Sequence, residues 1–201
     1  MIRNLVFDMG GVILAWSPDT FMEREGLRGE DKRIINENIF RSVEWLQMDR
    51  GIISPETAIS TMLSRLPERL RAVGKKLCWG WADDLILIPG MEELIAELKN
   101  LHYPIYLLSN ASKLQHEYWP KAPASRLFDA TFISCDCQLV KPMPEIYRAF
   151  TDHFRLEPSE CLFVDDTPAN VEAAIYCGWQ GIVFHGDTNQ LRERMKTLNI
   201  L

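Results

Sequence analysis

Acidic side chains follow two short apolar runs of the sequence, at the point where each run ends. Asp8 comes directly after Leu5–Phe7, and the adjacent Asp165 and Asp166 come directly after Cys161–Val164. If a fold brought these three carboxylates together, their mutual repulsion would raise their pKa values, and a divalent cation would relieve it. Carboxylate oxygens are hard ligands of the kind that Mg²⁺ prefers. The spacing therefore predicts a magnesium site.

Two further apolar runs are followed by groups that suit a bound anion. Ser109 and Asn110 follow Ile105–Leu108, and Lys141 comes after Thr131–Ile133. Taken singly, each has an ordinary explanation, since a Ser-Asn pair is typical of a turn or helix cap and a Lys-Pro pair of a solvated loop. Carboxylates, a divalent ion, a lysine and a hydroxyl in one place are the groups that phosphoryl transfer uses.

The elements that must position these residues form an alternating pattern. Five nearly continuous apolar runs are typical of parallel strands covered on both faces, namely Leu5–Phe7, Ile105–Leu108, Thr131–Ile133, Cys161–Val164 and Gly181–Phe184. Helical patterns follow or separate the last four, namely Met91–Leu101, Met143–Phe154, Pro168–Cys177 and Asp187–Leu198. This alternation predicts an α/β fold with a doubly wound parallel sheet. In such sheets ligands bind beyond the carboxyl ends of the strands, where the strand order reverses.

Residues 15–87 interrupt the alternation. Ser17-Pro18 and Ser54-Pro55 are typical helix starts, and Gly51 is placed to end the helix between them. The segment is far longer than a strand-to-helix crossover needs. We therefore expect a helical cap domain, 15–87, inserted into a core formed by 1–14 and 88–201.

Composition excludes several other classes of protein. The 201 residues are 47% hydrophobic and 25% charged, as in an ordinary globular protein, and the net charge of −6 argues against a nucleic-acid partner. Five cysteines with no Cys-x-x-Cys pair argue against a disulfide framework or a structural zinc site. Asp8 interrupts the N-terminal apolar run, and no run reaches the roughly 18 residues of a membrane helix. We therefore expect a cytoplasmic protein without a membrane partner.

Four stretches, taken together, carry a resemblance to a known family. The sequences VFDMGGVIL, YLLSN, KPMPEIY and LFVDDTPANVEAA occur in this order and span most of the chain. In this respect the chain resembles members of the haloacid dehalogenase (HAD) superfamily, most of which are phosphatases. It is similar in particular to small capped sugar-phosphate phosphatases. The resemblance implies a Rossmann-like core, an inserted helical cap and a small phosphorylated metabolite as the substrate.

The resemblance also implies a role for each site residue. Asp8 would be the nucleophile that forms an aspartyl-phosphate. Mg²⁺ would be held by Asp8, the main-chain carbonyl of Gly10 and Asp165, with Asp166 acting through water. Three further residues would bind the substrate phosphoryl group, namely Ser109, Asn110 and Lys141. Ser109 and Lys141 would also take part in catalysis.

Gly10 departs from the pattern of the family. Most phosphatases of this superfamily carry Asp-x-Asp, whose second acid protonates the leaving oxygen, and a missing acid-base group costs about 10²–10⁴ in rate. One alternative is therefore a metal-independent 2-haloacid dehalogenase, although dehalogenases of the superfamily lose the first acid of the fourth motif and this chain keeps both Asp165 and Asp166. The other alternative is a degenerate module that binds phosphate without turnover. Asp19 and His116 are candidate substitutes for the missing acid, although an exposed position is the default expectation for both.

Tryptophans near the predicted cap have two explanations. Trp79 and Trp81 precede the return of the chain to the core, where they would bury the seam between cap and core or stack on a substrate. Trp16 lies near the first connection and allows the same two explanations. Trp45 and Trp119 are expected to serve in packing alone.

Overall fold

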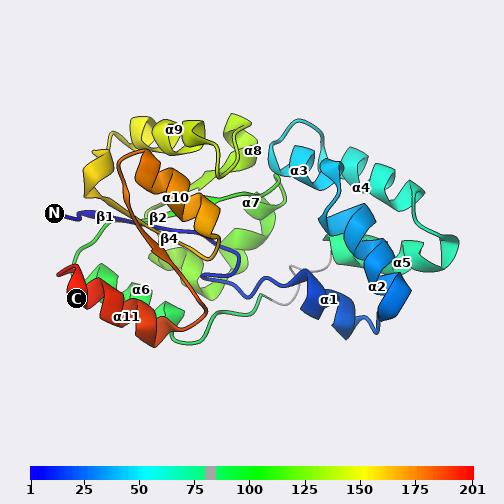
Figure 1. The fold of residues 1–201 in the computed structure, drawn as a ribbon, viewed down its shortest axis with the longest axis horizontal. Helices are drawn as coiled ribbons and strands as arrows, with labels where there is room; N and C mark the ends of the chain where they lie inside the picture. The colour runs from blue at the N-terminus through cyan, green and yellow to red at the C-terminus, as the bar shows by residue number, and fades with distance from the viewer. Residues whose placement is uncertain (80–84) are drawn as a thin grey trace.

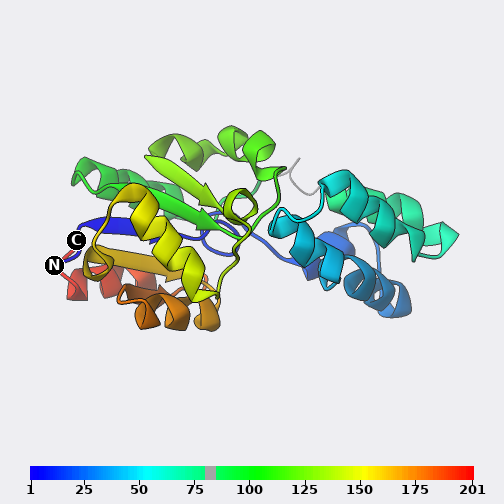
Figure 2. The same cartoon turned by 90° about the horizontal axis from the view of Figure 1, so that it is seen from above.

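The computed structural model describes residues 1–79 and 85–201, which form two lobes (Figures 1 and 2). The larger lobe contains a five-stranded parallel sheet in the order β3-β2-β1-β4-β5. The strands are β1 (Asn4–Phe7), β2 (Ile105–Ser109), β3 (Ala130–Ile133), β4 (Cys161–Asp165) and β5 (Gln180–Val183). The predicted doubly wound parallel sheet is confirmed, and each strand lies within a residue or two of its expected position.

Helices cover both faces of the sheet. The helices of the larger lobe include α6 (Met91–Asn100), α9 (Pro144–Phe154), α10 (Pro168–Tyr176) and α11 (Thr188–Thr197). Leu5 and Phe7 pack with α6 and α11 on one face, while Val6 packs with α9 and α10 on the other. Because successive strand residues point to opposite faces, a strand covered on both sides buries nearly all of its side chains and is therefore mostly apolar.

Short helical segments, which the sequence did not predict, fill the connections of this lobe. They are α7 (Gln115–Tyr118), η3 (Trp119–Lys121), η4 (Pro123–Leu127), α8 (Ser134–Cys137) and η5 (Pro158–Glu160). Trp119 is buried and packs edge-on against Phe128 at 5.1 Å between ring centroids, so its expected packing role is confirmed.

The smaller lobe, which we call the helical lobe, has a hydrophobic core of its own. Its helices are α1 (Pro18–Arg24), α2 (Gly29–Ile35), the π-helical η1 (Asn36–Phe40), α3 (Val43–Asp49), α4 (Pro55–Ser64) and α5 (Glu68–Trp79). The hydroxyls of Ser17 and Ser54 accept hydrogen bonds from the backbone N–H groups of Thr20 and Thr57, which caps α1 and α4 as expected. Met22, Ile35, Ile39 and Met62 are among its buried residues.

Two extended segments connect the lobes and pair with each other. The Ala15 N–H donates to the Ile86 carbonyl at 2.8 Å, and the Ile88 N–H donates to the Ile13 carbonyl at 2.9 Å. The expectation of helix as far as residue 87 is therefore wrong for residues 85–87, because pairing with the first connection holds them extended. Trp81 lies outside the described residues, and Trp79 at the end of α5 is 38% exposed.

Two further expectations concern the whole chain. All five cysteines are free thiols in the structure, as their number and spacing predicted. Among residues 1–79 and 85–201, none of the helices has both the length and the apolar character needed to cross a membrane.

Both chain termini lie at the end of the sheet lobe that faces away from the helical lobe (Figure 1).

Candidate functional site

The three predicted carboxylates meet at the edge of the sheet where the strand order reverses. β1 lies between β2 and β4, and Phe7 is in register with Val164, so Asp8 and Asp165 leave neighbouring strands at the same edge. Asp8, Asp165 and Asp166 each offer one carboxylate oxygen, and these three atoms lie within 4.8 Å of one another. The spacing would allow one ion to contact all three side chains.

Lys141 joins two of these acids. Its Nζ lies 2.6 Å from Asp8 Oδ1 and 2.7 Å from Asp165 Oδ2, and it also donates a hydrogen bond to the Leu108 carbonyl at 3.1 Å. The side chains of Lys141 and Asp165 are 1% and 0% exposed, and that of Asp8 is 13% exposed. The ammonium group is thus buried between two carboxylates, one of which borders the cavity described below.

Asn170, which was not among the predicted site residues, orients the buried acid Asp165. Its side-chain amide donates to both carboxylate oxygens at 3.1 Å, and the Thr167 N–H donates to Oδ1 at 2.8 Å. The Asn170 carbonyl in turn accepts a hydrogen bond from the Tyr147 hydroxyl at 2.7 Å. Its position in the first turn of the helix that follows Asp165 is the sequence feature from which its role could have been predicted.

Asn110 holds the backbone of Lys141. Its Nδ2 donates to the Lys141 carbonyl at 2.9 Å, and its Oδ1 accepts from the Lys141 N–H at 2.8 Å. These two bonds fix the point from which the lysine side chain reaches the acids. Ser109, the last residue of β2, is buried and lines the same cavity as Asp8.

Burial and like charge shape the protonation of the site. Burial raises the pKa of Asp8 from 3.8 to about 7. The positive charge of Lys141 offsets this rise in part, and the negative charge of Asp165 adds to it. Burial alone would lower the pKa of Lys141, but the two carboxylates outweigh it and hold that pKa above its ordinary value. Loss of surrounding water and the charge of Asp165 raise the pKa of Asp166. The acids therefore favour additional positive charge beside them.

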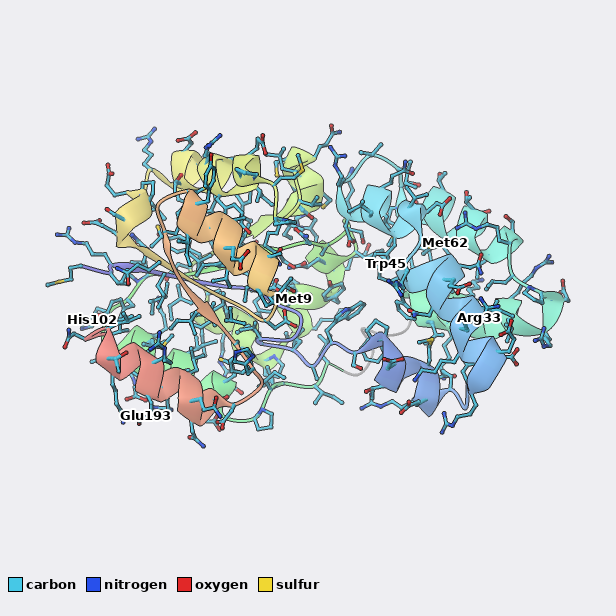
Figure 3. The ribbon with its side chains drawn as sticks, in the orientation of Figure 1. Met9, Arg33, Trp45, Met62, His102 and Glu193 are labelled. Atoms are coloured by element: carbon cyan, nitrogen blue, oxygen red, sulfur yellow. The ribbon has the colours of Figure 1, made fainter. Side chains whose placement is uncertain are left out.

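A cavity of about 280 Å³ opens onto these residues from between the two lobes. Residues of the sheet lobe that line it include Asp8, Gly10, Ser109, Asn110, Tyr118, Lys141 and Asp166, and those from the other side are Trp16, Trp45, Met48, Asp49 and Cys78. Figure 3 shows Met9 and Trp45 on the two sides of this junction. Only a packing role was expected for Trp45, and no sequence pattern pointed to Asp49 or Tyr118.

Trp16 occupies the space beside Gly10. A Cβ atom added at Gly10 would lie 3.2 Å from Trp16 Cβ and 3.3 Å from Cγ, which is tighter than ordinary contact. The Trp16 ring also packs against Trp45, at 6.1 Å between centroids. The indole thus fills the room into which a side chain at position 10 would extend.

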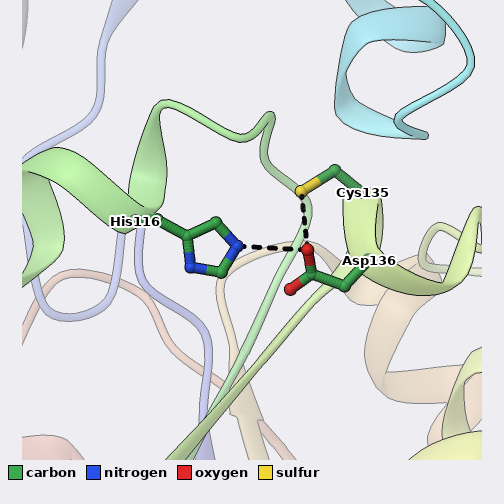
Figure 4. Close-up of side chains that lie close together, drawn as sticks. All are labelled: His116, Cys135 and Asp136. Atoms are coloured by element: carbon green, nitrogen blue, oxygen red, sulfur yellow. Dashed lines mark hydrogen bonds and ion pairs between the residues drawn. The ribbon is translucent and has the colours of Figure 1, made fainter.

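The two residues considered as substitutes for an acid at position 10 lie elsewhere. Asp19 is 73% exposed and pairs with Lys32 at 2.9 Å. His116 Nε2 lies 3.1 Å from Asp136 Oδ1, and Cys135 Sγ contacts the same oxygen at 3.6 Å (Figure 4). Neither Asp19 nor His116 lines the cavity as the described residues define it, so the default expectation of an exposed position holds for both.

Comparison with known proteins identifies the family. The family model described as haloacid dehalogenase-like hydrolase matches residues 2–178. The chain belongs to this family. Proteins similar to it include flavin mononucleotide hydrolase 1 of Arabidopsis thaliana, at 27% identity over 78% of this chain and 62% of that protein. The chain therefore spans less than two thirds of that relative.

Other relatives agree over nearly the whole chain. D-ribitol-5-phosphate phosphatase of Bacteroides thetaiotaomicron is 24% identical over 90% of both chains. A HAD family enzyme from the same organism, crystallised with magnesium and inorganic phosphate, superposes with a TM-score of 0.74 at 24% identity, covering 95% of this chain and 99% of that one. This structural likeness confirms the Rossmann-like fold. Together with the family model, the phosphatase relatives identify the chain as a HAD-like, phosphatase-like hydrolase.

Proposed function

We propose that this HAD-like hydrolase is a Mg²⁺-dependent phosphatase that cleaves a small phosphomonoester through an aspartyl-phosphate on Asp8. The observation that carries the proposal is the cluster of Asp8, Asp165 and Asp166, whose oxygens lie within 4.8 Å of one another. A dehalogenase that needs no metal would have no use for three converging acids. The buried Lys141 beside them supplies the positive charge that a phosphoryl group requires.

The donor set suits a small, hard cation. Asp8 and Asp165 would be direct ligands together with the main-chain carbonyl of Gly10, and Asp166 would act through water. Burial, with the charge of Asp165 adding to it, raises the pKa values of Asp8 and Asp166, and a bound cation would favour their ionised forms. When bound, the metal would supply the charge that keeps Asp8 ionised and neutralises the phosphoryl oxygens.

The residues of the chain would divide the reaction between them. An Asp8 carboxylate oxygen would attack phosphorus, and the bond from phosphorus to the leaving oxygen would break as the new bond forms. Lys141 would stabilise the charge that develops on the phosphoryl oxygens, and the Ser109 hydroxyl would donate a hydrogen bond to one of them. Asn110 would hold Lys141 in place at the substrate-binding side of the cavity.

Residues 15–87 would be the cap, and 1–14 with 88–201 the core. The lobes share one cavity, so the cap would exclude water from the aspartyl-phosphate and select the substrate. A volume of about 280 Å³ is at the low end for small-molecule sites. Sugar and polyol phosphates, the class that includes the named substrate of one relative, match this volume better than larger esters do.

Removal of the metal should abolish turnover. We expect chelation by EDTA to reduce phosphate release from sugar and polyol phosphates by at least about 10²-fold, and added Mg²⁺ to restore it, since Asp8 would otherwise be held by Lys141 and partly protonated. Phosphate release is measured by a colorimetric assay over a substrate panel. Release that persists in EDTA, or halide release from 2-haloacids in EDTA, would contradict the proposal and favour the dehalogenase alternative.

The conformation of Gly11 provides a second test of the metal site. Gly11 has φ +77°, and an added Cβ would overlap Asp166 Oδ2. We expect Gly11→Ala to displace Asp166 and to weaken Mg²⁺ activation by about 10–100-fold, as is usual for groups that support a metal. Gly26 has a similar φ of +76° with nothing within 4 Å, so Gly26→Ala is the matched control for backbone strain. Equal Mg²⁺ titration curves for the two variants would contradict the role of Asp166.

A further inference from the structure

The proposed reaction lacks a proton donor at the usual place. The leaving oxygen must gain a proton, and the water that later attacks the aspartyl-phosphate must lose one. Gly10 has no side chain, and the Trp16 indole fills the space beside it. Three carboxyl groups line the cavity, as the described residues define it, and two of them, Asp8 and Asp166, belong to the proposed metal site. The third is Asp49, which comes from the helical lobe.

The backbone of Asp49 is fixed to the sheet lobe. Asp49 is the last residue of α3, and its carbonyl accepts a hydrogen bond from the Ser134 hydroxyl at 2.6 Å. The same hydroxyl accepts from the Ala111 N–H at 2.9 Å, two residues beyond the end of β2. The Asp49 backbone is therefore held by the segments that directly follow β2 and β3, in addition to its own lobe.

Close packing across the lobes strengthens this attachment. Gly51 has φ +67°, and an added Cβ would overlap the Cys135 carbonyl oxygen, so the two backbones approach as closely as glycine allows. Arg50 Nε donates to the Gln138 carbonyl at 3.2 Å on the same side. The C-terminal end of α3 is thus clamped onto α8, which positions the Asp49 carboxyl at the cavity.

The surroundings of the Asp49 side chain suit proton transfer. The carboxyl is half-buried, and burial raises its pKa to about 7, an effect that the neighbouring Trp45 side chain and Ser112 backbone offset in part. Among the described residues, Tyr118 and Cys135 are titratable groups that feel the charge of Asp49. Burial and then Asp49 raise the pKa of Tyr118. Burial, then Asp136 and, to a smaller extent, Asp49 raise the pKa of Cys135, and Lys113 offsets this in part. Asp8 also raises the pKa of Tyr118, so this phenol lies within electrostatic reach of both carboxylates.

We propose that Asp49 is the proton-transfer residue of this enzyme, supplied across the lobe junction in place of the acid that Gly10 lacks. This inference rests on the proposed function. In the first step the Asp49 carboxyl gives its proton to the leaving oxygen as the phosphorus–oxygen bond breaks, which releases an alcohol. In the second step the Asp49 carboxylate takes a proton from water, the water oxygen bonds to phosphorus, and the bond to Asp8 breaks. Asp49 ends protonated and both residues are regenerated.

Substrates with different leaving groups test this role. In Asp49→Asn we expect kcat/KM to fall by about 10²–10⁴-fold for the alkyl phosphate that the wild-type enzyme hydrolyses fastest, because an alkoxide cannot leave unprotonated. With p-nitrophenyl phosphate, whose leaving group needs no proton, kcat/KM should change by less than about tenfold. The matched control is Asp19→Asn, an exposed acid of the same lobe, which should behave as wild type with both substrates.

The second step has its own readout. With p-nitrophenyl phosphate, Asp49→Asn should release a stoichiometric burst of p-nitrophenolate and then turn over slowly. The phosphorylated protein should accumulate and be visible by intact-protein mass spectrometry, because no carboxylate remains to activate water. A residue that merely supported the fold would produce neither the burst nor the accumulation.

The pH profile separates proton transfer from positioning. For the alkyl phosphate, the wild-type kcat/KM should fall as pH rises through about 7, since the protonated form of Asp49 acts first. Asp49→Asn should lose this limb, and Asp49→Glu, which keeps a titrating carboxyl, should retain it at reduced rate. Comparison between variants removes the ionisation of the substrate itself, which is common to all.

The outcomes distinguish the inference from the function on which it rests. If Asp49→Asn and Asp49→Glu keep the wild-type dependence on leaving group and pH, Asp49 is not the proton-transfer residue and the phosphatase proposal stands. If the wild-type enzyme with Mg²⁺ hydrolyses none of the phosphomonoesters, the proposed function itself is wrong. If the burst, the accumulation and the lost limb all occur, the inference is established.

Discussion

Replacing Asp8 by Asn is expected to abolish phosphate release, with a loss of at least about 10⁴-fold in kcat. The amide has the shape of the carboxylate but no anionic oxygen with which to attack phosphorus. Lys141 keeps its contact with Asp165 at 2.7 Å, so the variant should retain a folded site. The measurement is phosphate release at saturating substrate and Mg²⁺, and the phosphorylated protein should be absent from its mass spectrum.

The stability of the same variant has an expected pH dependence. The folded pKa of Asp8, about 7, lies above its ordinary value of 3.8, so the native state holds a proton that the unfolded chain has already lost. Metal-free wild-type protein should therefore lose stability as pH rises from about 4 to 7, and Asp8→Asn should lose less over that window. Thermal unfolding in EDTA measures this pH dependence of stability.

For the phosphate-release experiment, turnover of Asp8→Asn within tenfold of wild type would remove Asp8 from its assigned role. Asp19→Asn is the control for loss of a carboxylate elsewhere.

The centre of the sheet was predictable because β1, β2 and β4 are largely buried on both faces. A run such as Cys161–Val164 has no polar position, which is typical of a parallel strand covered on both faces. Because parallel strands end at the same edge, the positions of Asp8 and Asp165 followed from their strands alone. Lys141 is harder to predict, since α8 separates it from β3, and its place depends on the two hydrogen bonds between its backbone and the Asn110 side chain.

No local sequence pattern predicts that the helical lobe contributes side chains to the cavity. Asp49 and Trp45 lie on the seven-residue helix α3, and they reach the site because the end of this helix contacts the other lobe through Ser134 and through the packing of Gly51 against Cys135. The segment that includes Ile86 was expected to be helical, as part of residues 15–87, but it is extended. The extended conformation could not be predicted locally, because its partner Ala15 lies far away in the sequence. In both cases a contact between distant parts of the chain decides the outcome, and tertiary contacts of this kind override local propensity.

Lys141→Met is expected to lower both turnover and stability. Loss of the ammonium group should reduce kcat by about 10²–10³-fold, as removal of one electrostatic donor in a buried site usually does. Without metal, the variant leaves Asp8 and Asp165 facing each other without a cation, and breaking a buried pair in this way costs about 3–5 kcal/mol in the free energy of unfolding. Urea unfolding in EDTA measures the loss, and Lys121→Met, at an exposed lysine, should change stability by no more than about 0.5 kcal/mol.

Magnesium should restore much of that stability but not the activity. A cation bound to the acids would take over the neutralising charge of the missing ammonium, so Mg²⁺ should stabilise Lys141→Met more than it stabilises wild type, in which the two compete for Asp8 and Asp165. Acidification should act in the same direction, since protonation of Asp8 removes one of the two unpaired charges. Equal stabilisation of both proteins by Mg²⁺ would mean that the metal does not bind at these carboxylates, and the proposed metal site would then be wrong.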